Sequence, residues 1–90
     1  MMTGINYIEA ERVIAMEKRY VLRNRLRVCR AERPISQEEL ALSAGVTRQT
    51  ISAIENNQYV PSAQLAFLLA LCLGKQVTEV FYLEEVTTHD

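Results

Sequence analysis

Polar side chains that can hydrogen-bond to nucleic acid are concentrated in a single short stretch of this sequence. Four of the five residues from 48 to 52 are polar, namely Arg48, Gln49, Thr50 and Ser52, and the fifth is Ile51. Apolar residues three positions apart share one face of a helix, so Ile51 and the isoleucine at position 54 would point inward and the polar side chains outward. Groups at the exposed start of such a helix can bond to base edges or to phosphates. This stretch is therefore the candidate binding site.

Two short helices joined by a sharp turn are predicted to position these side chains. Ser36 can cap the first helix, because Glu39 three residues later completes a Ser-x-x-Glu capping box. Gly45 can adopt the positive φ that ends this helix, and Thr47 can cap the second. Ala41 is small enough to let the two helices cross closely. The pattern predicts a helix-turn-helix unit.

The composition is typical of one small globular domain. The chain has 90 residues, of which 49% are hydrophobic, so it can bury a modest core. Its longest apolar run, residues 65–73, is about half of what a membrane span needs, and its first residues lack the pattern of a secretory signal. Cys29 and Cys72 are too few and too far apart for a disulfide scaffold or a zinc site. We therefore expect a cytoplasmic protein with reduced cysteines.

Charge is distributed unevenly along the chain. Residues 12–33 hold eight of the ten basic residues and only two acidic ones, so this segment carries +6 while the remainder carries −7. Such a split can place a basic face on one side of a nearly neutral domain. A charged helix exposed to solvent is the alternative explanation.

Further helices are predicted on either side of the central unit. Residues 24–32 should form a helix that ends before Pro34, which cannot continue it. Ser62 should cap a helix over residues 63–73, and Gly74 should end it. Because this helix is apolar nearly all round, it is expected to be the buried centre of the domain. Thr78 is expected to cap a last short turn.

The spacing of Ala41, Gly45 and Ile51 resembles the usual skeleton of the XRE family, the helix-turn-helix class of Cro and the phage repressors. Residues 48–56 strengthen this resemblance, which extends from about residue 21 to residue 85. It implies an all-α fold of the five-helix lambda-repressor-like type that binds DNA.

Two terminal segments complete the predicted organisation. A short two-stranded antiparallel sheet is expected from residues 20–23 and 81–86, as in several members of the family. Residues 21–86 would form the DNA-binding domain, and residues 1–20 a helical N-terminal extension outside the resemblance. This extension could contact a protein partner.

The resemblance also implies roles for individual residues. Gln37, opening the first helix of the motif, would contact a phosphate through its side chain or its backbone amide. Arg48 and Gln49 would enter the major groove, where arginine pairs with guanine and glutamine with adenine. The implied DNA-binding set is Gln37, Thr47, Arg48, Gln49, Thr50, Ser52 and Asn56.

Arg30 and Glu55 match a charged pair that ties the first helix of these domains to the recognition helix. Glu55 would not contact DNA, since phosphate repels a carboxylate. The pair is expected to be structural, although two unrelated surface charges would give the same sequence.

Two classes of function fit these observations. The first is sequence-specific binding of double-stranded DNA by a homodimer at an inverted-repeat operator, which represses transcription. The second is a protein-interaction module, such as an antitoxin or an anti-repressor partner with the same fold. An enzyme is not expected, because the sequence has one histidine, no Ser/His/Asp or Cys/His set and no glycine-rich phosphate loop. No cofactor or metal is expected either.

Overall fold

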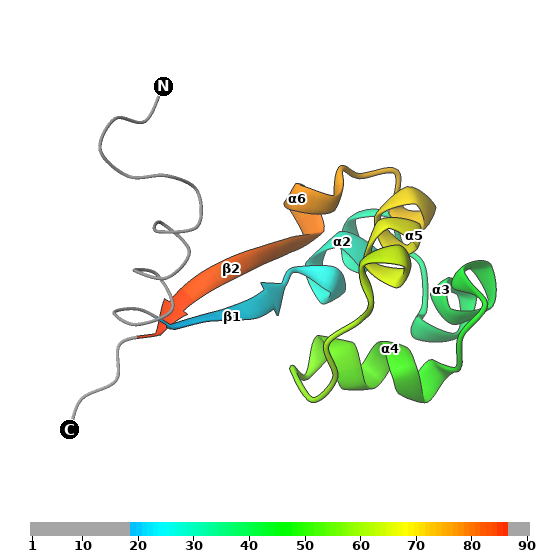
Figure 1. Cartoon of the computed structure of the whole chain (residues 1–90). Coiled ribbons are helices and arrows are strands. Elements are labelled where there is room, and N and C mark those ends of the chain that lie inside the picture. Colours follow the sequence, from blue (N-terminus) through cyan, green and yellow to red (C-terminus); the bar gives the residue numbers. More distant parts are fainter. Residues whose placement is uncertain (1–18, 87–90) are drawn as a thin grey trace.

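A computed structural model describes residues 19–86, which form five helices and a two-stranded antiparallel sheet (Figure 1). The fold is therefore mostly helical and not all-α. The predicted helical extension lies outside the described residues, apart from residues 19 and 20, which belong to a strand. The elements in chain order are β1 (Arg19–Asn24), α2 (Leu26–Glu32), α3 (Gln37–Ala44), α4 (Arg48–Glu55), α5 (Ala63–Leu73), α6 (Val77–Val80) and β2 (Phe81–Val86).

The two strands form a ribbon that extends away from the helices (Figure 1). Leu22 lies opposite Leu83, and the register runs from Asn24 opposite Phe81 to Arg19 opposite Val86. The predicted antiparallel pairing is thus confirmed, and β1 is one residue longer at each end than expected. The ribbon brings the first and last described residues together at its tip.

Helix α2 begins two residues later than predicted. Asn24 belongs to β1, and its side-chain oxygen accepts a hydrogen bond from the backbone N–H of Leu26 at 3.1 Å. The backbone N–H of Arg25 donates to the carbonyl of Val80 at 2.7 Å. The pairing of Asn24 with Phe81 and the bond from Arg25 to Val80 join distant parts of the chain and commit both residues to the sheet and its junction, which local helix propensity does not reveal.

The predicted caps of the helix-turn-helix unit are confirmed. The Ser36 hydroxyl accepts from the N–H of Glu39 at 3.0 Å, and the Glu39 carboxylate accepts from the N–H of Ser36 at 2.9 Å. Gly45 ends α3 with a φ of +73°. Thr47 then caps α4, its hydroxyl accepting from the N–H of Thr50 at 3.2 Å.

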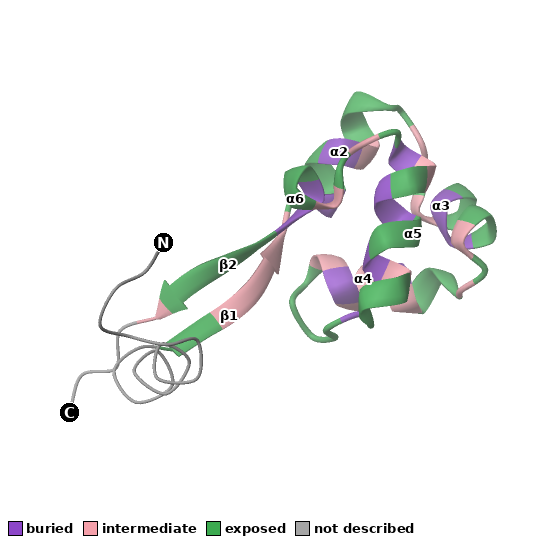
Figure 2. Cartoon of the chain, turned by 45° about the horizontal axis from the view of Figure 1, so that its top comes forward, coloured by how far each residue is buried: buried purple, intermediate pink, exposed green. Residues whose placement is uncertain are grey.

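Helix α5 is not buried all round, so that prediction is wrong. Its buried residues, Ala66, Leu69, Ala70 and Leu73, follow the spacing of one helical face. Phe67 and Leu71 on the opposite side are 62% and 74% exposed, and Figure 2 shows this division of the helix into buried and exposed segments. Within residues 19–86, the other helices cover only one face of α5.

The last helix is capped by a different residue from the one predicted. Gln76 precedes α6, and its backbone N–H donates to the Glu79 carboxylate at 2.7 Å. Thr78 lies inside the helix and is exposed. A glutamate at the third position of the helix therefore fixes its start.

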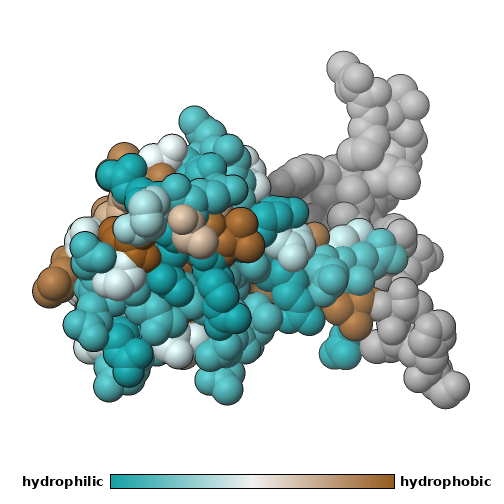
Figure 3. Space-filling view, turned by 180° about the vertical axis from the view of Figure 1, so that it is seen from behind, coloured by the Kyte–Doolittle hydropathy of each residue, from teal (hydrophilic) through white to brown (hydrophobic). Residues whose placement is uncertain are grey.

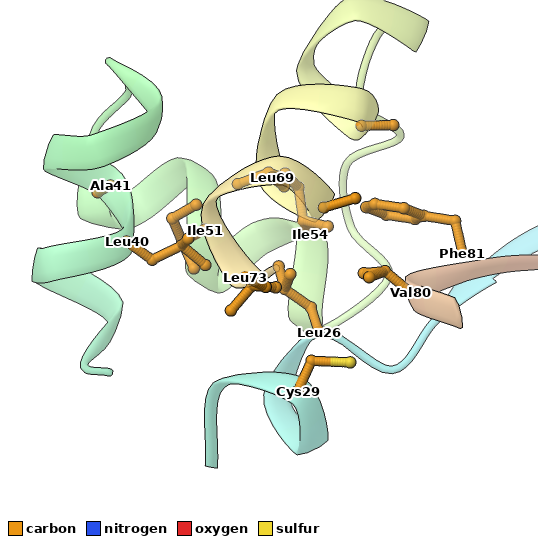
Figure 4. Packing of buried hydrophobic residues seen from close by; sticks show 12 residues of the cluster. Leu26, Cys29, Leu40, Ala41, Ile51, Ile54, Leu69, Leu73, Val80 and Phe81 are labelled. Carbon is orange, nitrogen blue, oxygen red and sulfur yellow. The ribbon is translucent and has the colours of Figure 1, made fainter. Parts of the chain in front are cut away.

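Each helix contributes to one apolar core (Figure 4). Leu40, Ile51 and Leu69 are fully buried, and Val80 from α6 is as well. Cys29 is also buried, and burial raises the pKa of its thiol. Within residues 19–86, no helix is long and apolar enough to cross a membrane, and no three His, Cys, Asp or Glu side chains are grouped to hold a metal ion.

Candidate nucleic-acid interface

Helix α4 is anchored by one face and presents the other to solvent. Ile51 and Ile54 are 0% and 1% exposed, whereas Arg48 and Gln49 in the first turn are exposed. Gln49 makes no side-chain hydrogen bond with any residue between 19 and 86. The lower part of the domain, where Figure 1 places α4, is largely hydrophilic in the view of Figure 3. An unengaged amide beside an arginine can bond to the edge of a base.

The hydroxyls near the start of α4 are already partly used by the helix. The Thr47 and Thr50 hydroxyl oxygens lie 3.0 Å apart, and Thr47 also caps the helix. Thr50 and Ser52 are half-buried. These three residues therefore offer shorter and more restricted contacts than Arg48 and Gln49.

A buried carboxylate joins the three helices around the motif. The Glu55 side chain has no exposed surface and accepts from Arg30 Nε at 2.6 Å and from Arg30 Nη2 at 3.3 Å. Gln37 Nε2 donates to it at 2.9 Å. Arg30 lies in α2, Gln37 in α3 and Glu55 in α4. The group fixes how these helices meet.

Hydrogen bonds keep this carboxylate charged in spite of its burial. Burial by itself raises the pKa of Glu55, but the hydrogen bonds from Arg30 and Gln37 and the charge of Arg30 outweigh it. The pKa is therefore lowered from the ordinary value of 4.5. A carboxylate with several charge-assisted donors behaves in this way.

The side chain of Gln37 bridges this carboxylate and Arg48 in the first turn of α4. Its Nε2 donates to Glu55, and its Oε1 accepts from Arg48 Nη1 at 3.2 Å. Its amide is thus engaged on both sides, while the backbone N–H at the start of α3 remains for a phosphate. The bridge links the exposed guanidinium of Arg48 to the buried carboxylate, a connection that the sequence did not predict.

Arg27 is a further residue of this surface that the sequence analysis did not single out. Its Nη2 donates to Asn56 Oδ1 at 3.2 Å, and its Nε approaches Glu55 at 3.4 Å. The spacing of Arg27 and Arg30 is the available signal, because residues three apart share one face of a helix.

Two residues of the basic segment, Arg23 and Glu32, form ion pairs with the remainder of the chain. Arg23 pairs with Glu84 at 2.8 Å, and the Glu32 of that segment pairs with Lys75 at 3.0 Å. Arg25 lies 4.1 Å from the centre of the Tyr82 ring. Within residues 19–86, Arg23 is therefore paired away from the motif, and Arg27 and Arg30 lie beside Glu55 of α4.

The sequence and the fold are both similar to those of known helix-turn-helix proteins. The helix-turn-helix family HTH_3 matches residues 26–80. Uncharacterised HTH-type transcriptional regulators of Methanocaldococcus jannaschii and Bacillus subtilis are each 42% identical over 64 residues, covering 71% of this chain and 97% of each relative. A crystal structure described as a candidate DNA-binding protein from Bacteroides fragilis is 26% identical with a TM-score of 0.65, covering 69% of this chain and 100% of that one.

Replacing Glu55 by alanine should lower the free energy of unfolding by about 3 kcal/mol, because Arg30 is left without its partner. Wild-type stability from Glu55 is complete above pH 4.5 and is lost as the pH falls through the lowered folded pKa. In Glu55→Ala, the free energy of unfolding should not show this loss at acidic pH. Urea unfolding at several pH values measures both effects.

Glu84→Ala is the matched control, since it removes the Arg23 pair, whose side chains are 36% and 50% exposed. Exposed pairs contribute about 1 kcal/mol or less. Equal losses in the two variants would contradict the structural role of Glu55.

Proposed function

Because this chain belongs to the HTH_3 helix-turn-helix family, the XRE and Cro type of DNA-binding transcriptional regulators, we propose that it represses transcription as a homodimer on an inverted-repeat operator. The family acts by binding DNA and not by catalysis. The observation that best supports the proposal is the exposed first turn of α4, held from below by two buried isoleucines. We take residues 21–86 as the DNA-binding domain, acting in the cytoplasm.

In this proposal α4 enters the major groove by its first turn. Arg48 keeps free N–H groups besides the one bonded to Gln37, and two of them can bond to O6 and N7 of guanine. Gln49 can bond to N6 and N7 of adenine. Thr50 would contact a thymine methyl or a phosphate. The remaining phosphate contacts would come from Thr47, Ser52, Asn56 and the backbone N–H of Gln37.

The exposed face of α5 supports the homodimer. Ala63, Gln64, Phe67, Leu68 and Leu71 line a shallow apolar hollow of about 440 Å³. Large exposed apolar patches commonly mark interaction sites. No residue of this face is charged, so two copies can meet across a two-fold axis without like-charge repulsion. A second copy of the chain is therefore its proposed partner.

The same face would also suit the second class of function, a protein-interaction module. DNA binding and protein–protein binding differ in how their affinity responds to salt. Each phosphate neutralised by the protein contributes about −0.9 to the slope of log affinity against log salt concentration. A heterocomplex that buries the α5 face would instead survive high salt.

Selection of duplexes from a random pool by the pure protein tests the proposed function. We expect a palindromic consensus with half-sites about one helical turn apart, since each protomer presents one recognition helix. Recovery of no consensus, together with a salt-resistant protein complex, would favour the interaction module.

Replacing Arg48 by alanine should weaken binding to the selected duplex by about 1–3 kcal/mol and affect a scrambled duplex much less. The reason is that base contacts, unlike phosphate contacts, distinguish sequences. Fluorescence anisotropy with both duplexes measures this difference. Equal losses on the two duplexes would mean that Arg48 contacts only phosphate.

Replacing Leu71 by lysine should shift the protein from dimer to monomer in sedimentation velocity, because two charges would then face each other across the axis. Leu71 is 74% exposed, so the fold should tolerate the change. Leu42→Lys, at an 82% exposed position on α3, is the matched control. A dimer that persists in Leu71→Lys would exclude the α5 face as the interface.

A further inference from the structure

Two guanidinium groups share one carboxylate at the C-terminal end of α4. Arg30 binds Glu55 closely, at 2.6 and 3.3 Å, and its side chain is only 17% exposed. Arg27 approaches the same carboxylate at 3.4 Å while its side chain stays 65% exposed. One negative charge therefore meets two positive ones, and the excess charge resides on Arg27 at the surface.

This excess charge counteracts a property of helix ends that would otherwise repel DNA. The C-terminal end of a helix carries roughly half a negative charge from its unpaired carbonyls. Glu55, the last residue of α4, adds a full negative charge that Arg30 neutralises. With Arg27 present, the balance at this end of α4 becomes positive.

Contacts within the domain also position the Arg27 side chain and still leave some of its N–H donors available. Its Nη2 donates to Asn56 Oδ1 at 3.2 Å, which fixes the guanidinium beside the C-cap of α4. A guanidinium has five N–H groups, so three remain beyond the contacts with Glu55 and Asn56. Those three donors and the exposed side chain can receive an anion.

The length of α4 indicates which part of DNA would meet this end. Arg48 and Asn56 are eight residues apart, which is about 12 Å along a helix. The major groove is also about 12 Å wide. When the first turn of α4 lies at the base edges, the opposite end therefore lies near the sugar–phosphate backbone.

From this arrangement we propose that Arg27 is a phosphate-binding residue, which together with Asn56 clamps the DNA backbone at the end of α4 opposite to Arg48. The inference rests on the proposed function and adds a residue to that site. Arg27 secures the position of the recognition helix, and Arg48 and Gln49 supply the discrimination between sequences.

Anisotropy titrations of Arg27→Gln over a range of salt concentrations test this assignment. We expect the selected duplex and a scrambled duplex to lose affinity by the same factor, about three- to tenfold, and the salt slope to become shallower by about 0.9. Arg33→Gln, at the exposed C-cap of α2, is the matched control and should keep the wild-type slope.

Arg27→Lys is a second control, which separates the loss of charge from an effect on folding. It retains the charge while losing the guanidinium fork. This variant should keep a slope close to that of the wild type. A wild-type slope in Arg27→Gln would overturn the assignment, as would a loss confined to the selected duplex, which would indicate base recognition. Failure of the wild type to bind any duplex would instead refute the proposed function.

Discussion

The buried carboxylate of Glu55 is the constraint on which the arrangement around the motif depends. A charge without solvent contact is strongly unfavourable unless its oxygens are saturated by donors. Here Arg30 of α2 and Gln37 of α3 supply those donors to the last residue of α4. A shift of any of the three helices would leave the charge unsatisfied. The apolar core, which is less directional, could tolerate such a shift more easily.

The same network extends from the interior to the surface of the domain. The amide oxygen of Gln37 accepts a hydrogen bond from Arg48 and so orients its side chain. Glu55 attracts Arg27 to the opposite end of α4. One buried group thereby orders a cation at each end of the recognition helix. An arginine that is already oriented loses less side-chain entropy on binding than a free one.

Local features of the sequence were sufficient to predict the caps and the turn of the helix-turn-helix unit. Ser36, Glu39 and Gly45 act within a few residues of one another, so their roles can be inferred without the fold. The start of α2 and the exposure of Phe67 could not, because they depend on segments distant in sequence. The same applies to the candidate site. The polar residues of α4 were evident, but the bridge through Gln37 exists only when three helices meet.

The ribbon of β1 and β2 has a consequence for the order in which the chain can assemble. Its paired residues, from Asn24 with Phe81 to Arg19 with Val86, are 57 to 67 positions apart, whereas α3 and α4 are neighbours in the chain. Distant pairings are slow because a long loop must close first. During synthesis, α3 and α4 can therefore fold before β2 is available to pair with β1. The ribbon then forms last, after the helical unit has folded.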